Sequence, residues 1–252
     1  MHPVLSEKRG AVNLITLNRP EHRNAVNPAA AQALHDAFTQ GEADDEVMVH
    51  VLTGSGGQFC AGADLKAFVN GETFATTAPL GPSWLNLTKP SIAAVEGYAV
   101  AGGLELALLC DLRVAARSAV FGVFCRRWGV PLIDGGTVRL PRLIGQSRAL
   151  DMILTGRAVN ADEAFSFGLA NRLVDDGKAL EESLALAESL TVFPQSCMRN
   201  DRAAAVAQWS LTLSDALQYE NQLGRQSLAD GAVTGAARFV AGHGRKGDFE
   251  SL

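Results

Sequence analysis

The chain has 252 residues, of which 47% are hydrophobic and 19% are charged, and its formal net charge is −5. A chain of this length and composition can bury a large core, which excludes disorder as its main feature. The acidic balance and the scattered Lys and Arg residues argue against a nucleic-acid partner. The cysteines lack the spacing of a zinc site, so we expect reduced thiols and no metal ligands at Cys60, Cys110, Cys125 and Cys197.

The chain also lacks the apolar segments that a membrane protein needs. Its N-terminus, MHPVLSEK, has no apolar stretch typical of a signal peptide. No apolar segment approaches the roughly 18 residues that suggest a membrane span. We therefore expect a cytoplasmic protein with no membrane partner.

Strands and helices are expected to alternate along the first half of the chain. Residues 12–17 (VNLITL) predict a strand that ends before Pro20, and Ala and Leu at helical spacing predict a helix over residues 28–38. Further strands are expected at residues 47–52, 91–95, 112–116 and 119–121. This alternation predicts an α/β fold, in which ligands usually lie at the C-terminal ends of the strands.

The second half of the chain is expected to be mostly helical. Strand patterns fade after Pro141, and amphipathic helices are predicted at residues 148–155, 161–167, 179–190 and 199–226. No low-complexity or Pro-rich linker interrupts the chain. We expect a core over residues 1–190 and a C-terminal helical region over residues 191–252.

Two glycine-rich segments each follow a predicted strand. The first covers residues 53–65, and the second places Gly102 and Gly103 before an apolar helix whose first turn carries Glu105. The first turn of a helix has unpaired N–H groups and the positive end of the helix dipole. Glu105 can be there only because negative charge is favourable at that point, or it can be a carboxylate that performs chemistry.

Other short motifs do not point to a site. Residues 242–247 match G-x-G-x-x-G, but no βαβ unit surrounds them, so we reject dinucleotide binding there. No phosphate-binding P-loop and no G-x-S-x-G nucleophile motif occurs, and the five histidines form no metal or triad spacing. His50 lies within a strand pattern and is expected to be packed rather than catalytic.

Three segments together resemble the enoyl-CoA hydratase/isomerase (crotonase) superfamily in order and spacing: residues 17–25, residues 59–65 (FCAGADL) and residues 97–111. Matching residues continue as far as residue 169. The resemblance implies an α/β fold with a crotonase-like spiral core of repeated ββα units and a C-terminal helical trimerisation region. It also implies a homotrimer or a dimer of trimers, an acyl-CoA thioester as substrate, and no metal or redox cofactor.

The same resemblance implies an oxyanion hole made by the backbone N–H groups of Ala63 and Gly102, with Glu105 as an acid or base. Two such donors stabilise negative charge on a thioester oxygen, and an apolar enclosure raises the pKa of a carboxyl group. Substrate or CoA contacts are expected from Arg23, Ala25, Ala61, Asp64, Leu65, Lys66 and Lys246, whose basic members can equally be solvated surface charges. Expected pocket walls are Phe68, Trp84, Leu85, Leu87 and Trp128.

The chain departs from the hydratase pattern at the second glutamate, where Cys125 stands instead. A thiol cannot orient a water molecule with two acceptor oxygens, so packing is the expected role of Cys125. Asp134 matches the place of a catalytic aspartate in the dienoyl-CoA isomerases of this superfamily, although the loop is one residue longer here. Alternatively, Asp134 is a turn or helix N-cap residue. Arg126 or Arg127 can pair with Asp134 and lower its pKa.

These observations leave three hypotheses open. The first is hydration of a 2-enoyl-CoA, the default for the family, with proton transfer by Glu105. The second is double-bond isomerisation of an enoyl-CoA or dienoyl-CoA, which needs no precisely held water. The third is a family member that binds acyl-CoA without turning it over, because the second glutamate is absent.

Overall fold

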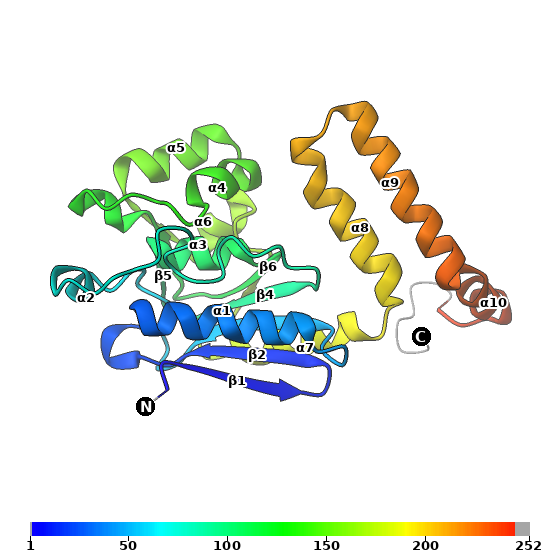
Figure 1. Cartoon of the computed structure of the whole chain (residues 1–252), viewed down its shortest axis with the longest axis horizontal. Helices are drawn as coiled ribbons and strands as arrows, with labels where there is room; N and C mark the ends of the chain where they lie inside the picture. Colours follow the sequence, from blue (N-terminus) through cyan, green and yellow to red (C-terminus); the bar gives the residue numbers. More distant parts are fainter. Residues whose placement is uncertain (1, 245–252) are drawn as a thin grey trace.

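A large sheet is formed by strands from the first two thirds of the chain (Figure 1). The computed structural model describes residues 2–244. Its strand order is β1-β2-β3-β4-β6-β9, with β1 antiparallel to β2 and every other pair parallel. The strands are β1 (Val4–Arg9), β2 (Val12–Leu17), β3 (Val49–Gly54), β4 (Ser91–Val95), β6 (Leu112–Ala116) and β9 (Arg172–Val174). Strands β2, β3 and β4 are almost wholly buried, as expected for parallel strands covered on both faces.

A smaller sheet has the order β5-β7-β8 and contains β5 (Tyr98–Val100), β7 (Val120–Gly122) and β8 (Ala158–Asn160). Strand β4 of the large sheet leads into β5 of the small one and then into helix α3 (Gly102–Leu109). Strand β6 likewise leads into β7 and then into the 3₁₀ turn η2 (Phe124–Trp128). The chain therefore repeats a strand-strand-helix unit, and the expected α/β spiral core is confirmed.

Helices α1 (Pro28–Ala43) and α7 (Ala179–Thr191) cover opposite faces of the large sheet. The other helices before residue 192 are α2 (Leu65–Val69), α4 (Gly136–Ile144), α5 (Gln146–Thr155) and α6 (Ala161–Phe167), with a 3₁₀ turn η1 (Pro20–His22) before α1. Side chains of α7, including Leu186, pack on one face against Val51 and Ile92. The opposite face packs into the main core, to which α1 contributes Phe38 and α3 contributes most of its length. Because α3 is buried all round, its first turn is fixed in place.

The chain after α7 forms a separate group of helices that lies beside the sheets (Figure 1). This group contains α8 (Gln195–Ala207), α9 (Leu213–Ser227) and α10 (Val233–Ala241), with the turns η3 (Gln208–Ser210) and η4 (Leu228–Ala232) between them. None of their residues is buried within the chain. Arg202 fastens α8 to the core, since its Nε atom lies 2.8 Å from Asp111 Oδ2 and its Nη1 atom donates to the carbonyl oxygen of Leu87. No helix in residues 2–244 is both long enough and apolar enough to cross a bilayer.

Several sequence-based expectations need correction. A single helix over residues 199–226 is wrong, because the chain turns at residues 208–212 and Thr212 begins a new helix by accepting a hydrogen bond from the N–H of Asp215. The fading of strands after Pro141 is also wrong, since β8 and β9 follow. These strands have three residues each, which is too short to show a period of two. Strand β1 was not predicted because most of its side chains are exposed and show no apolar alternation.

Other expectations are confirmed. The four cysteines are free thiols, and all of them except Cys197 are buried. His50 is fully buried, and its Nε2 atom lies 2.9 Å from Glu42 Oε1 while its Nδ1 atom faces the amide of Asn13. His50 is therefore a packed residue that joins α1 to the sheet.

Candidate active site

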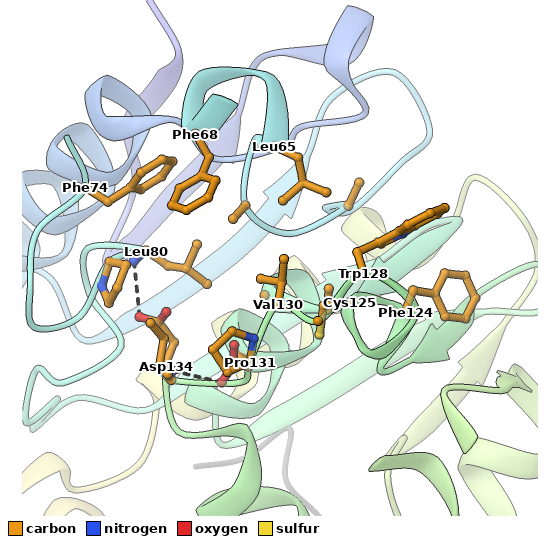
Figure 2. Close-up of a pocket in the computed structure, with 18 of the residues that line it drawn as sticks. Leu65, Phe68, Phe74, Leu80, Phe124, Cys125, Trp128, Val130, Pro131 and Asp134 are labelled. Carbon is orange, nitrogen blue, oxygen red and sulfur yellow. Dashed lines mark hydrogen bonds between the residues drawn. The ribbon is translucent and has the colours of Figure 1, made fainter. Parts of the chain in front are cut away.

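A cavity of about 650 Å³ opens between the segment that contains α2 and the segment that joins η2 to α4 (Figure 2). Its lining brings together both glycine-rich segments, through Ala61 and Ala63 from the first and Gly102 and Glu105 from the second. Cys125 and Asp134 also line it. The residues that the sequence assigned to chemistry thus share one cavity.

Two backbone N–H groups at this cavity have no acceptor within residues 2–244. Val26 forms a bridge beside Ala63: its N–H donates to the carbonyl oxygen of Gly62, and its carbonyl oxygen accepts from the N–H of Asp64. The N–H of Ala63 therefore points away from Val26. Gly102 is the first residue of α3, where an N–H group has no partner inside the helix. These two donors are placed to bind an oxygen atom that carries negative charge.

The two donor segments approach each other closely because glycines permit it. A Cβ atom on Gly62 would lie 2.8 Å from the nitrogen of Gly102, and one on Gly103 would lie 2.0 Å from the carbonyl oxygen of Cys60. Ala101, just before α3, has φ 54° and ψ −124°, a conformation that L-residues rarely adopt. The backbone is therefore held in an unusual path at the point where the N–H of Gly102 faces the cavity.

Glu105 is a buried carboxyl group with one oxygen bound and one free. Its Oε1 atom accepts hydrogen bonds from the N–H groups of Asp134 (2.9 Å) and Gly136 (2.8 Å). No donor in the described chain reaches its Oε2 atom. Burial, with a smaller contribution from the nearby Asp134 carboxyl, raises the pKa of Glu105 to about 7, although the two N–H groups oppose this shift. Glu105 is only 2% exposed, so it can hold or release a proton near neutral pH inside an apolar site.

Asp134 has the same arrangement as Glu105. Its Oδ1 atom accepts hydrogen bonds from the hydroxyl of Ser83 and from the N–H of Leu80 (3.1 Å), while no donor of the described residues reaches Oδ2. Burial raises the pKa of Asp134, and the hydrogen bond from Ser83 moderates that rise. Asp134 is not a helix cap, because Gly135 is the cap residue of α4. The expected N-cap role is therefore wrong, whereas the expected turn position holds, since Asp134 lies in the bend directly before α4.

Arg139 and Ser83 hold Asp134 in place from behind. Arg139 Nη1 donates to the carbonyl oxygen of Asp134 (2.9 Å), and its Nη2 atom donates to that of Ser83 (2.6 Å). Arg126 and Arg127 donate instead to backbone carbonyls at residues 153 and 156. The expected pairing of Asp134 with Arg126 or Arg127 is wrong, because η2 directs both side chains towards α5 and its end.

The part of the cavity that η2 forms carries no carboxyl group. Cys125 lies there in η2, with Phe124 and Trp128 beside it (Figure 2). Burial raises the pKa of the Cys125 thiol, and the nearby Glu105 raises it further. Cys125 is thus a neutral side chain that packs into the main core, and it supplies no base.

The remaining expected contact residues differ in where they lie. Ala61 and Leu65 line the cavity, whereas Arg23 and Lys66 are exposed and Ala25 is half-buried. Asp64 does not line the cavity, and Lys246 lies outside the described residues. Asp64 instead caps α2 through the N–H groups of residues 66 and 67.

Asp64 also forms an ion pair with Arg19, whose Nη2 atom lies 2.8 Å from Asp64 Oδ2. Although burial opposes ionisation, the hydrogen bonds from Arg19 and from the N-terminus of α2 lower the pKa of Asp64. Both of its oxygens are therefore used within the protein. We assign Asp64 to holding the segment that carries Ala63.

The expected pocket walls are only partly found. Phe68 and Trp128 line the cavity, whereas Trp84 and Leu85 line a separate hollow beside α1 and Leu87 is buried elsewhere. Sequence reasoning missed Ser83, Arg139 and Phe74. No motif marks these residues, because Ser83 reaches Asp134 only through folding across 51 positions.

A cavity with two unpaired N–H donors and two buried carboxyl groups has the groups with which an enzyme can stabilise a developing oxyanion and move protons beside it. The family model for enoyl-CoA hydratase/isomerase matches residues 7–244. The chain therefore belongs to the enoyl-CoA hydratase/isomerase family.

Individual relatives agree with this assignment. A probable enoyl-CoA hydratase from Rhizobium meliloti is 39% identical over 98% of this chain and 97% of its own. The crystal structure of an enoyl-CoA hydratase from Mycobacterium tuberculosis superposes with a TM-score of 0.91 at 38% identity, covering 96% of each chain. A carnitinyl-CoA hydratase from Mycobacterium avium superposes with a TM-score of 0.77 at 34% identity, covering 94% of this chain and 97% of its own. The crotonase fold is thus confirmed.

Proposed function

We propose that this enzyme adds water to the double bond of a 2-enoyl-CoA, with Glu105 and Asp134 as its acid and base. The observation that carries this proposal is the pairing of two buried carboxyl groups, each with one oxygen bound by the protein and one left free. Relatives named as hydratases at 35–39% identity support hydration as the reaction type.

Glu105, with a pKa of about 7, carries the proton near neutral pH. We assign the role of base to Asp134, whose Oδ1 atom is held by Ser83 and the N–H of Leu80 while Oδ2 is left free. Asp134 takes a proton from water while the water oxygen bonds to C3 of the thioester. The electron pair of the double bond moves onto the thioester oxygen, where the N–H groups of Ala63 and Gly102 stabilise it. Glu105 then gives its proton to C2, and a proton passes from Asp134 back to Glu105.

Double-bond isomerisation is the second candidate, and the side of the cavity that carries Cys125 favours it. In the hydratase pattern a second glutamate stands at that position, whereas here the second carboxyl group of the cavity is that of Asp134, whose N–H donates to Glu105. One pair of carboxyl groups can remove a proton from one carbon and return it to another without holding a water molecule. In that case Glu105 or Asp134 removes the proton, and the same oxyanion hole stabilises the enolate.

The two reactions give different products from defined thioesters. The purified protein is incubated with crotonyl-CoA, a 3-enoyl-CoA and a 3,5-dienoyl-CoA, and the absorbance is followed. Hydration removes the enoyl absorbance of crotonyl-CoA, whereas isomerisation shifts the absorbance of the other two. Binding without turnover of any of the three would contradict both reactions and leave an acyl-CoA-binding protein.

We also propose that the enzyme assembles as a homotrimer or a dimer of trimers through α8, α9 and α10. Support comes from large apolar side chains that these helices leave exposed in one chain, among them Leu213, Leu217 and Val233. Light scattering on the eluted protein tests this, and a monomer would contradict it. With acyl-CoA as its substrate we place the enzyme in the cytoplasm, and we assign Arg23 and Lys66 to the CoA phosphates.

A further inference from the structure

The cavity around Glu105 and Asp134 is lined by no basic side chain among the described residues. Of its lining residues, only Thr76, Cys125, Trp128 and the two acids carry a polar side-chain atom. The rest are small or apolar. A charged group on the substrate would therefore find no opposite charge except the two carboxyl groups that the proposed reaction uses.

Arg139 and Arg127 lie near the cavity but do not supply that charge, because their guanidinium groups are bound elsewhere in the protein. Arg139 donates to two backbone carbonyls behind Asp134. Arg127 donates to the carbonyl of Gly156 and lies over the ring of Phe124, with its guanidinium carbon 4.4 Å from the ring centroid. An anionic acyl group would thus be desolvated beside two acids without a partner, which is strongly unfavourable.

Aromatic rings surround the cavity from both sides. Phe68 and Phe74 come from the segment around α2, and Phe124 and Trp128 come from η2 on the other side (Figure 2). Phe68 and Trp128 are 67% and 71% exposed, far more than such rings normally are in a finished core. A bound acyl group would cover both of them, and flat rings pack well against another ring.

The rings do not form a cage for a cationic acyl group. Such cages place several ring faces around one ammonium group. One face of Phe124 already carries the Arg127 guanidinium, which would repel a second cation. The four rings are therefore better suited to an uncharged group.

From this lining we infer that the enzyme acts on a thioester with a large, uncharged, ring-bearing acyl group rather than a short or charged one. The inference rests on the proposed function, because it takes the cavity to be the acyl site. The cavity volume of about 650 Å³ leaves room well beyond a four-carbon chain. One additional apolar carbon that fits such a pocket favours the larger of two substrates over the smaller about tenfold or more.

Saturated thioesters test the inference independently of turnover. Dissociation constants are measured by calorimetry for butyryl-CoA, phenylpropionyl-CoA, glutaryl-CoA and trimethylammoniobutyryl-CoA. Phenylpropionyl-CoA is expected to bind at least about tenfold more tightly than butyryl-CoA, and the two charged thioesters more weakly than butyryl-CoA. Tightest binding of butyryl-CoA or of either charged thioester would overturn the inference. Failure of the proposed function would show separately, as an absence of turnover with enoyl-CoA substrates.

Two matched variants connect the preference to the rings. Phe68→Ala removes a lining ring, and Phe165→Ala removes a ring from α6 that is half exposed and lies outside the cavity. Phe68→Ala should weaken the binding of phenylpropionyl-CoA about tenfold and that of butyryl-CoA by less than about threefold. Phe165→Ala should change neither dissociation constant. An equal loss for both thioesters in Phe68→Ala would contradict a role for this ring in acyl selection.

Discussion

The two sides of the cavity offer a thioester very different chemistry. On one side Glu105 and Asp134 are buried, have raised pKa values and are held by backbone N–H groups and by Ser83. On the other side Cys125, Phe124 and Trp128 provide no group that gives or takes a proton near neutral pH. Under the proposed function, proton transfer therefore belongs to the neighbouring carboxyl groups of Glu105 and Asp134, and the part of the cavity formed by η2 contributes apolar walls.

Of the substitutions that test this comparison, removal of the Glu105 carboxyl group should lower the activity most. Glu105→Gln keeps the oxygen that accepts from Asp134 and Gly136, so the fold is preserved, but it can no longer transfer a proton. We expect kcat to fall about 10³-fold. Steady-state kinetics measure the loss, and an unchanged unfolding temperature excludes a folding defect. Activity within about threefold of the wild type would contradict a catalytic role for Glu105.

Asp134→Asn should have the second largest effect. The asparagine oxygen can still accept from Ser83 and from the N–H of Leu80, so the loop stays in place. Loss of the base should lower kcat about 10²-fold, with a smaller change in KM. If instead Asp134→Asn lost stability and kept its kcat, Asp134 would be a structural residue.

Removing the hydroxyl of Ser83 should shift a pH profile rather than abolish activity. Ser83 donates to Asp134 and favours its ionised form, so Ser83→Ala raises the pKa of Asp134 further. The limb of the pH–rate profile on which Asp134 must be ionised then moves to higher pH, while the limb of Glu105 near pH 7 stays in place.

The matched control is Ser183→Ala. Ser183 is also fully buried, but its hydroxyl has no hydrogen-bond partner within residues 2–244. Its profile should not move. A loss of rate in Ser83→Ala that is equal at every pH would indicate packing alone.

The smallest effect on kcat is expected for a substitution at Cys125, in the part of the cavity without carboxyl groups. Cys125→Ser keeps the size of the side chain, and the thiol takes no part in proton transfer, so kcat should stay within about threefold of the wild type. Progress curves with the same thioester are sufficient to measure it. A loss above about 100-fold would show that the thiol acts in the reaction and that the two sides are not so different.

The parts of the molecule that the sequence predicts are those with a local signal. Strand β4 and helix α6 match the expected residue ranges because apolar spacing and turn residues mark their ends. The glycines around Gly102 are needed for the close approach of two loops, and they belong to one of the three segments that carry the resemblance to the family. The raised pKa of Glu105 was expected from its apolar neighbours and is confirmed.

The parts that could not be predicted depend on distant contacts. Ser83 and Arg139 have no motif, yet together they fix the position of Asp134. The roles of Arg126 and Arg127 were predicted wrongly because adjacency in sequence does not determine the direction of a side chain on a 3₁₀ turn. Tertiary geometry was needed to separate a packed residue from one that faces the cavity.

Exchange of hydrogen for deuterium at the α carbon of phenylpropionyl-CoA in heavy water tests most directly whether Glu105 moves the α proton while the N–H groups of Ala63 and Gly102 stabilise the enolate. At a pH of about 8, Glu105 is ionised, since its pKa is about 7. We expect the wild-type enzyme to incorporate deuterium, as followed by NMR, and Cys125→Ser to do the same, while Glu105→Gln does not. Absence of exchange in the wild type, or equal exchange in Glu105→Gln, would contradict the proposed site.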